Sequence, residues 1–272
     1  MPSTVSPTRQ TSVIVGRFFA FLLASLATTT LPAQVTDINP APAFSGERLV
    51  DLPTSDWITN GGNAYNQRYS PLDEINRETV AGLRGVWRAR LNGSGLETKY
   101  SGEAQPIIYD GVVYIITGAD DVFAISVDTG EHLWSYEANL DQSIDTICCG
   151  WTNRGVAIGE GKVFFGQLDG KLIALDQTTG ATEWSTQAER WQEGFSITSA
   201  PLYYDGLVIT GFAGAEYGVR GRVKAYDAED GSLVWTFYTI PGPGEIGHET
   251  WPQDNNVYLY GGGTVWQTPA VD

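Results

Sequence analysis

Basic residues are scarce in this chain of 272 residues, which has 16 Lys and Arg against 32 Asp and Glu and a net charge of −16 at pH 7. Proteins that grip nucleic acids through their phosphates need the opposite balance, so nucleic acid is excluded as a partner. Histidine and cysteine are also scarce, with two residues each. They leave little material for a zinc site, and no complete phosphate-binding or dinucleotide-binding glycine motif is present.

What the chain does contain is typical of a folded all-β protein. Hydrophobic residues make up 42% and charged residues 18% of the sequence, which is enough apolar surface for a large core. Aromatic residues reach 12%, and there are 32 glycines. Aromatic side chains favour strands, and glycine favours tight turns. The composition therefore predicts many short strands joined by turns.

The N-terminus has the pattern of a signal peptide. Arg9 and Arg17 precede an apolar run from Phe18 to Ala27, and small residues follow up to Ala33. This order of a basic region, an apolar region and a cleavage site is typical of exported proteins, and the run is too short to cross a bilayer as a helix. An N-terminal anchor is the alternative. We therefore expect residues 1–33 to be removed and residues 34–272 to fold in the periplasm.

The two cysteines, Cys148 and Cys149, are adjacent. In an exported protein paired thiols are expected to oxidise, and the nearest partner of each is its neighbour. Neighbouring Cα atoms lie only about 3.8 Å apart across a trans peptide, below the usual disulfide range, so such a ring would be strained. Strain of this kind is usually tolerated at functional sites. Two buried free thiols are the alternative, and the cysteines alone leave both open.

One sequence element recurs three times with a period near fifty residues. It occupies residues 124–134, 174–184 and 225–235, and each copy has a glycine six residues after its first alanine and a tryptophan four residues later. The three tryptophans are spaced by 50 and 51 residues, and Trp87 lies 47 residues before the first of them. This period is the size of a propeller blade. The repeated tryptophan is expected to pack between neighbouring blades.

Turn chemistry places the strands inside each period. Asp110-Gly111, Glu160-Gly161 and Asp205-Gly206 each separate two β-rich runs, which is typical of a β-hairpin. The repeated element supplies two more strands around its own glycine. The sequence therefore predicts an all-β fold, a β-propeller built of four-stranded antiparallel blades. It holds three full repeats, a portion around Trp87 and the opening of another repeat at Gly261, so we expect part of a longer ring.

Four side chains occupy equivalent positions at the start of successive blades. Glu103, Thr198 and Trp266 each stand three residues before a proline, and Arg154 stands three residues before Ala157. Because equivalent positions in a propeller are related by rotation about its axis, these four side chains should meet at one end of the channel. A guanidinium can pair with a carboxylate, and an indole offers a stacking face. The set suits a flat, polar, anionic ligand.

The third repeat has an enlarged loop beside these positions. The distance from the glycine that ends the second strand to the alanine of the repeated element is six and eight residues in the first two repeats, and fourteen in the third. This loop contains Gly214, Ala215 and Glu216. Glu216 is either a solvated surface acid or a ligand for a hard cation, which prefers carboxylate oxygens.

Four motifs resemble the quinoprotein alcohol dehydrogenases, which use pyrroloquinoline quinone (PQQ). They are Cys148-Cys149 with Asn153-Arg154-Gly155, Thr198-x-Ala200-Pro201, Gly214-Ala215-Glu216-x-Gly218-Val219-Arg220-Gly221, and Gly261-Gly262-Gly263-Thr264-x-Trp266. With the repeats they cover nearly all of residues 34–272. The adjacent cysteines with Asn-Arg-Gly are the most specific of the four, whereas the tryptophan repeat also occurs in non-catalytic propellers.

The resemblance implies an eight-bladed propeller with the quinone lying flat between a vicinal disulfide and an indole. The quinone-binding residues would be Glu103, Cys148, Cys149, Arg154, Thr198, Gly214, Ala215 and Trp266, and Glu216 would bind the metal, which is calcium in most members and a lanthanide in others. The metal would polarise the reactive quinone carbonyl. Ala213 differs from the serine that many members have at this position, which removes one expected hydrogen bond to the quinone.

The resemblance also implies an activity. Members oxidise a primary alcohol to the aldehyde by hydride transfer to the quinone, and a cytochrome c-type partner then accepts the electrons. The family's catalytic aspartate is expected beyond Asp272, so residues 34–272 would be the N-terminal part of the quinoprotein domain, which needs further C-terminal blades and is inactive alone. The alternatives are a non-catalytic propeller scaffold of the outer-membrane assembly type and a PQQ sugar dehydrogenase.

Overall fold

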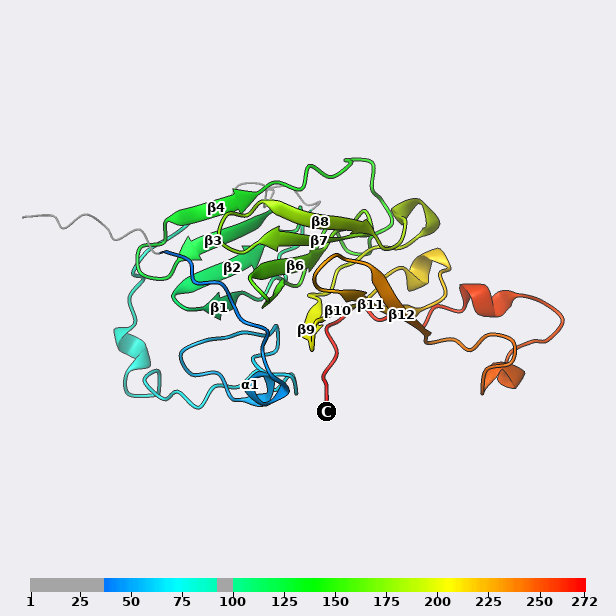
Figure 1. The fold of residues 1–272 in the computed structure, drawn as a ribbon, viewed down its shortest axis with the longest axis horizontal. Coiled ribbons are helices and arrows are strands. Elements are labelled where there is room, and N and C mark those ends of the chain that lie inside the picture. The colour runs from blue at the N-terminus through cyan, green and yellow to red at the C-terminus, as the bar shows by residue number, and fades with distance from the viewer. Residues whose placement is uncertain (1–36, 92–99) are drawn as a thin grey trace, which may run out of the picture. The chain divides into compact units, whose positions relative to one another are not determined.

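The computed structural model describes residues 37–91 and 100–272, which belong to one compact unit, 35–272 (Figure 1). The expected signal peptide, residues 1–33, lies outside the described residues and stays a prediction. Within the described ranges, no helix is long and apolar enough to cross a membrane. The one α-helix there, α1 (Gly46–Val50), has five residues, so the fold class is all-β, as the composition predicts.

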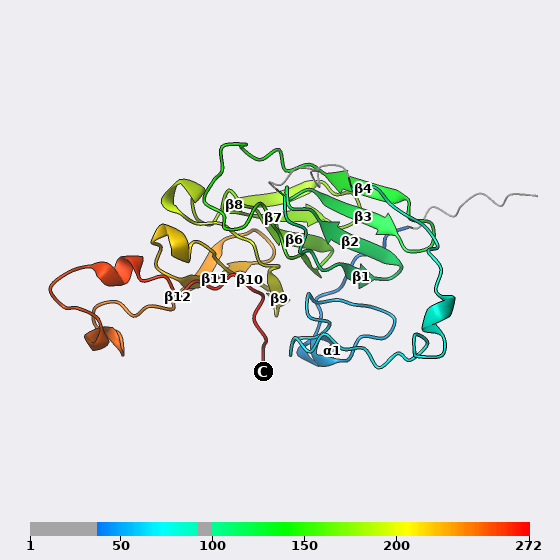
Figure 2. The same cartoon turned by 180° about the vertical axis from the view of Figure 1, so that it is seen from behind.

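The described strands form three four-stranded antiparallel sheets, which are the three predicted blades (Figures 1 and 2). The first blade contains β1 (Ile107–Tyr109), β2 (Val112–Ile116), β3 (Val122–Ser126) and β4 (His132–Tyr136). The second contains β5 (Ala157–Gly159), β6 (Lys162–Gly166), β7 (Lys171–Asp176) and β8 (Thr182–Gln187). The third contains β9 (Leu202–Tyr204), β10 (Leu207–Gly211), β11 (Arg222–Asp227) and β12 (Leu233–Tyr238). In each blade the sheet order follows the chain order.

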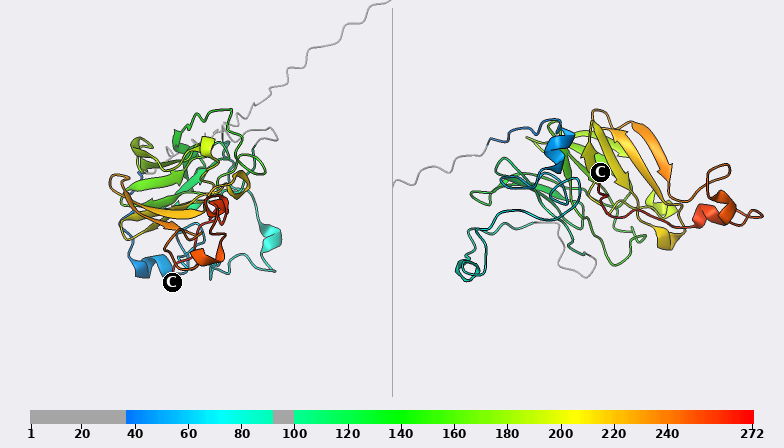
Figure 3. Two further views of the ribbon diagram at one scale, coloured as in Figure 1. Left: turned by 90° about the vertical axis from the view of Figure 1, so that its right-hand side faces the viewer. Right: turned by 90° about the horizontal axis from the view of Figure 1, so that it is seen from below.

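Short 3-10 helices occupy the connections. They are η1 (Val80–Gly82), η2 (Trp191–Glu193), η3 (Ala215–Tyr217), η4 (His248–Thr250) and η5 (Val257–Tyr260). The last two lie in the polar, proline-rich excursion that follows β12, which projects from the third blade in Figure 1 and in the right-hand view of Figure 3. No strand is present among the described residues of this excursion.

The first hairpin of every blade turns through two left-handed residues. Their φ angles are 45° and 76° at Asp110-Gly111, 51° and 71° at Glu160-Gly161, and 48° and 72° at Asp205-Gly206. Positive φ at both central residues defines the turn whose twist matches that of paired strands, and aspartate and glycine tolerate it best. The predicted hairpins are therefore confirmed, and their cause is local turn chemistry.

Two of the three repeated tryptophans, and Trp87 before them, pack against the following blade as predicted, whereas Trp235 is 38% exposed. The indole nitrogens of Trp87, Trp134 and Trp184 each donate to a backbone carbonyl of the following blade, at 2.6, 2.9 and 3.2 Å. Each indole lies against the turn glycine of that blade, so closely that an added Cβ would meet the ring at 2.6 Å. The tryptophan and the glycine of the repeated element are therefore partners across the blade interface.

The ends of the repeat pattern differ from the expectation. No strand is assigned in the described segment around Trp87, and near Gly261 there is only an isolated bridge between Arg220 and Gly262. A strand needs a neighbouring strand to complete its hydrogen-bond ladder, and the indole of Trp87 finds its contact on Gly130 without one. At Trp87 the side-chain packing is therefore retained although no strand pairing is formed.

A mostly buried ion triad joins the second and third blades. Glu189, which follows β8, forms ion pairs with Arg222 (2.8 Å) and Lys224 (2.7 Å) of β11. The three side chains are only 10–17% exposed. Replacing Glu189 by glutamine should lower the free energy of unfolding by about 2 kcal/mol, because two largely desolvated cations lose their counter-charge. Urea unfolding measures this loss, and equal midpoints for variant and wild type would contradict it.

Candidate ligand site at the propeller axis

A pocket of about 560 Å³ opens where the blades meet. All nine residues that the sequence singles out for the quinone and the metal line this one pocket, although they are spread over more than 160 positions of the chain. They are Glu103, Cys148, Cys149, Arg154, Thr198, Gly214, Ala215, Glu216 and Trp266. The structure thus brings the predicted residues together; their roles toward a ligand stay predictions.

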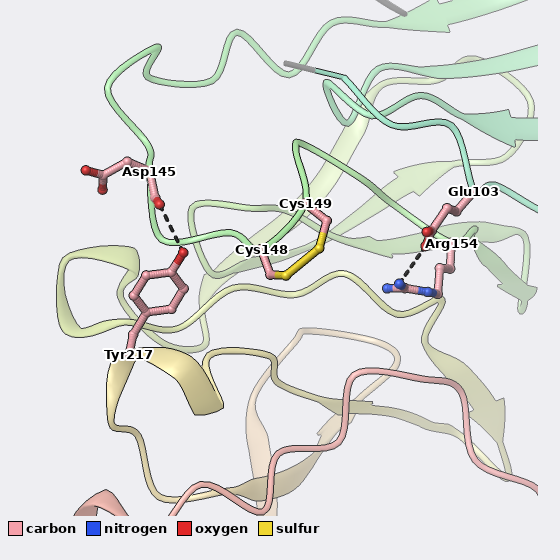
Figure 4. Close-up of a disulfide and its surroundings, with 6 residues drawn as sticks. All are labelled: Glu103, Asp145, Cys148, Cys149, Arg154 and Tyr217. Carbon is pink, nitrogen blue, oxygen red and sulfur yellow. Dashed lines mark hydrogen bonds and ion pairs between the residues drawn. A yellow bond between two sulfur atoms is a disulfide. The ribbon is translucent and has the colours of Figure 1, made fainter. Parts of the chain in front are cut away.

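Arg154 is the centre of this arrangement. Its guanidinium forms an ion pair with Glu103 at 2.5 Å and donates a hydrogen bond to the Thr198 carbonyl at 3.1 Å (Figure 4). It also lies 4.8 Å from the ring centroid of Trp266 and donates to that residue's carbonyl at 3.4 Å. The four equivalent blade positions therefore meet, as the alignment of the repeats predicts, and they meet through the guanidinium.

The backbone around Arg154 is fixed on both sides. Its N–H donates to the carbonyl of Thr198 (3.1 Å), and its own carbonyl accepts from Gln105 N (3.0 Å) and Asn60 Nδ2 (2.9 Å). The next residue, Gly155, has φ 145°, and a Cβ there would come within 3.0 Å of Asn60 and Gln105. Glycine after Arg154 is thus required for three chain segments to converge at this point.

The two cysteines form one wall of the pocket. Their sulfur atoms are joined in the structure, and their Cα atoms lie 3.8 Å apart (Figure 4). Cys149 and Gly150 both have positive φ, at 68° and 94°, which turns the chain sharply. Behind this turn, Trp151 is buried, and its indole nitrogen donates to the carbonyl of Ile144 at 3.2 Å. A buried aromatic anchor therefore holds the strained turn in place.

The enlarged loop of the third blade forms the opposite wall. Gly214 (φ 122°) leads into η3, and its missing side chain lets the loop lie against the carbonyl of Gly194. The hydroxyl of Tyr217 donates to the carbonyl of Asp145 at 3.2 Å, which ties this loop to the cysteine segment (Figure 4). Burial raises the pKa of Tyr217, and the nearby carboxylates of Glu216 and Asp145 add to the effect.

Glycines also position Trp266. The segment that begins at Gly261 runs back along the third blade, where Gly221 N donates to the Gly262 carbonyl at 2.7 Å and Gly262 N donates to the Val219 carbonyl at 3.0 Å. A Cβ on Gly221 would overlap the backbone of Gly263. Because the two backbones approach this closely, the chain reaches the pocket rim at Trp266, whose side chain remains 45% exposed.

Glu216 is the acidic side chain of the enlarged loop and faces the pocket. Among the described residues, no group of three or more His, Cys, Asp or Glu side chains lies close enough together to hold a metal ion. Glu216 can therefore offer one carboxylate to a cation, which is the kind of oxygen ligand that hard cations prefer.

Sequence reasoning missed two buried hydroxyls in the pocket wall. Thr152 and Ser196 line the pocket, are 5% and 0% exposed, and have no hydrogen-bond partner for their hydroxyl oxygens in the described part of the chain. A weak signal existed for both. Ser196 stands two residues before Thr198, which is the spacing that places side chains on one side of an extended segment. Thr152 lies between the cysteines and Arg154 in the most specific motif.

The fold and the pocket define a class: a β-propeller whose blades meet at a pocket lined by a guanidinium, an indole and two adjacent cysteines. The chain belongs to the PQQ family described as "Glucose/ethanol/alcohol dehydrogenase, beta-propeller domain", which matches residues 57–272. It is similar to the quinohemoprotein alcohol dehydrogenase ADH IIB of Pseudomonas putida, with 39% identity over 262 residues. The match covers 92% of this chain and 36% of that protein.

Solved structures agree with this assignment. The quinohemoprotein alcohol dehydrogenase ADHIIG from Pseudomonas putida HK5 aligns with a TM-score of 0.76 and 35% identity over 86% of this chain and 36% of that one. A europium-containing methanol dehydrogenase aligns with a TM-score of 0.72 and 32% identity, over 81% of this chain and 41% of that one. The chain thus spans well under half the length of these relatives.

Proposed function

We propose that the axial pocket binds pyrroloquinoline quinone and that the whole protein is a periplasmic PQQ-dependent alcohol dehydrogenase. The observation that carries the proposal is the contact of Arg154 with Glu103, Thr198 and Trp266 in a pocket that Cys148 and Cys149 also line. A guanidinium and a hydroxyl suit the carboxylate edges of the quinone, and an indole suits its flat ring system. The residues present therefore fit the group.

Each pocket residue then has a distinct task. Arg154 would bind a quinone carboxylate with paired N–H groups, and Glu103 would hold the guanidinium in the orientation for doing so. Cys148 and Cys149, as a vicinal disulfide, would present a rigid surface to one face of the ring system and Trp266 would cover the other. Gly214 and Ala215 lack bulk, so that the ligand can approach their backbone closely.

Pyrroloquinoline quinone, when bound, would supply the hydride acceptor for alcohol oxidation, and in the whole protein a cytochrome c-type partner would take up the electrons. Glu216 would hold a Ca²⁺ ion, or a lanthanide as in the europium-containing relative, and the cation would act as a Lewis acid in the pocket. The adjacent cysteines favour alcohols over sugars, although the family description names glucose as well. A primary alcohol is therefore the proposed substrate class.

Titration of the purified chain with PQQ, followed by tryptophan fluorescence, tests this function. Binding should be at least about tenfold tighter with Ca²⁺ than with EDTA, because Glu216 would hold the cation in the pocket that takes the anionic ligand. Glu216→Gln should remove the metal dependence. Glu193→Gln is the matched control, since Glu193 is an exposed acid of η2 outside the pocket. No quinone binding by the wild-type chain under either condition would overturn the proposal.

A further inference from the structure

A buried carboxylate outside the pocket connects the first blade to the segment that carries Arg154. Asp120 lies in the turn between β2 and β3 and is completely buried. Its Oδ1 accepts a hydrogen bond from Asn153 Nδ2 at 2.8 Å, and its Oδ2 accepts one from the backbone N–H of Leu168 at 2.7 Å. Leu168 follows β6 and Asn153 precedes β5, so both donors come from the second repeat.

The backbone conformation of Asp120 indicates that the turn itself does not require an aspartate side chain at this position. The same turn occurs in the second blade, where Gly170 N donates to the Gln167 carbonyl as Asp120 N donates to the Thr117 carbonyl, both at 3.0 Å. Gly170 has φ 83° and Asp120 has φ 65°. This left-handed conformation favours glycine. The first blade therefore has Asp120 at the turn position where the second blade has Gly170, although glycine suits the left-handed backbone better.

The side chain of Asn153 connects Asp120 to the backbone on either side of Arg154. Besides its bond to Asp120, its Nδ2 donates to the Gly166 carbonyl at 2.8 Å, and its Oδ1 accepts from Gly155 N at 3.2 Å. The side chain is 1% exposed. Asn153 and Gly155 flank Arg154 in sequence, so one buried amide fixes the chain on both sides of the arginine. Neither Asp120 nor Asn153 lines the pocket itself.

We propose that Asp120, acting through Asn153, is a positioning residue for Arg154. Loss of the carboxylate removes an acceptor from the Asn153 amide, which is then free to reorient, and the segment around Arg154 loosens. The guanidinium would no longer be held between Glu103 and Trp266. The consequence for quinone binding rests on the proposed function, whereas the effect on the segment is a property of the protein alone.

Asp120→Gly separates the two possible roles of this residue. Glycine suits the left-handed backbone better than aspartate, so a residue needed only for the turn should be replaced without loss. A positioning role predicts instead that amide hydrogen exchange speeds up about tenfold in the peptide covering 149–156 and at Leu168. It also predicts a dissociation constant for PQQ that is about tenfold higher, in the range seen for outer-shell substitutions.

Glu189→Gln is the matched control, because Glu189 is also a mostly buried acceptor between blades but lies outside the pocket. It should lower stability without changing exchange in 149–156 or the affinity for PQQ. If Asp120→Gly does not fold, Asp120→Asn keeps the shape with one acceptor and is measured in its place. Exchange in 149–156 that is unchanged, or that rises equally in all three blades, overturns the positioning role. A wild-type chain that binds no PQQ would overturn the proposed function, and the exchange comparison would still decide this inference.

Discussion

Gly180→Ala should lower the free energy of unfolding by about 3 kcal/mol, one of the two largest effects that the structure predicts. Gly180 has φ 73°, and a side chain in the left-handed region costs about 1–2 kcal/mol. Its added Cβ would also meet the indole of Trp134 at 2.6 Å. That indole is tightly held, since it is only 9% exposed and donates to the Gln177 carbonyl. Overpacking at such a contact adds about 1–3 kcal/mol.

Gly111→Ala is the matched control for this substitution. Gly111 has nearly the same backbone conformation, with φ 76°, but an added Cβ there would meet nothing within 4 Å. Only the backbone cost remains, so we expect a loss of about 1 kcal/mol. Urea unfolding of both variants gives the difference between them. Equal losses would mean that the contact between tryptophan and glycine across the blade interface contributes nothing to stability.

The contact between tryptophan and glycine shows which features of the blade interface could be predicted from the sequence alone. The period of fifty residues, the hairpin glycines and the tryptophan between blades follow from local turn chemistry and from repetition, and all three are confirmed. The partner of each tryptophan could not be read from one repeat. Trp134 and Gly180 lie 46 positions apart, and only the stacking of complete blades brings one element's indole onto the next element's glycine.

The candidate site likewise has features that the sequence could predict and features that it could not. Rotation about a propeller axis was enough to predict that Glu103, Arg154, Thr198 and Trp266 converge. It could not predict that Arg154 contacts the other three, because that depends on side-chain conformations and on the close backbone approach at Gly155. The enlarged loop was found from its length, but its tie from Tyr217 to the Asp145 carbonyl joins two irregular segments that share no repeat position.

The role of Asp120 could not be predicted from the sequence for a different reason. An aspartate in a turn is common, because its side chain tolerates left-handed backbone and can bond locally. Its burial and its two bonds to the second repeat arise only when the blades pack. Burial raises the pKa of this carboxyl well above its usual range, against the two hydrogen bonds that favour the charged form. A residue with ordinary sequence surroundings is thus one of the most unusual in the folded chain.

Arg154→Gln should raise the dissociation constant for PQQ about 100-fold. The substitution removes the paired N–H donors and leaves the Glu103 carboxylate without its cation, facing an anionic ligand. Losing one partner of a fully buried charge pair costs about 2–5 kcal/mol, and this pair is only partly buried. The Arg154 side chain is 19% exposed, but that of Glu103 is 45% exposed, so solvent screens part of the effect. A loss of about 3 kcal/mol corresponds to roughly 100-fold in affinity.

Two further variants separate the causes of this loss. In the double variant Arg154→Gln/Glu103→Gln no unpaired carboxylate remains, so quinone affinity should recover by about tenfold relative to Arg154→Gln alone. Arg154→Lys keeps the charge but not the planar fork, and should lie between Arg154→Gln and wild type. Fluorescence titration with PQQ measures all three. An Arg154→Gln variant that binds within about threefold of wild type, a difference of about 0.7 kcal/mol, would show that the guanidinium does not hold the ligand. In that case the contacts among the four equivalent blade positions would have only a structural role, in packing the blades together.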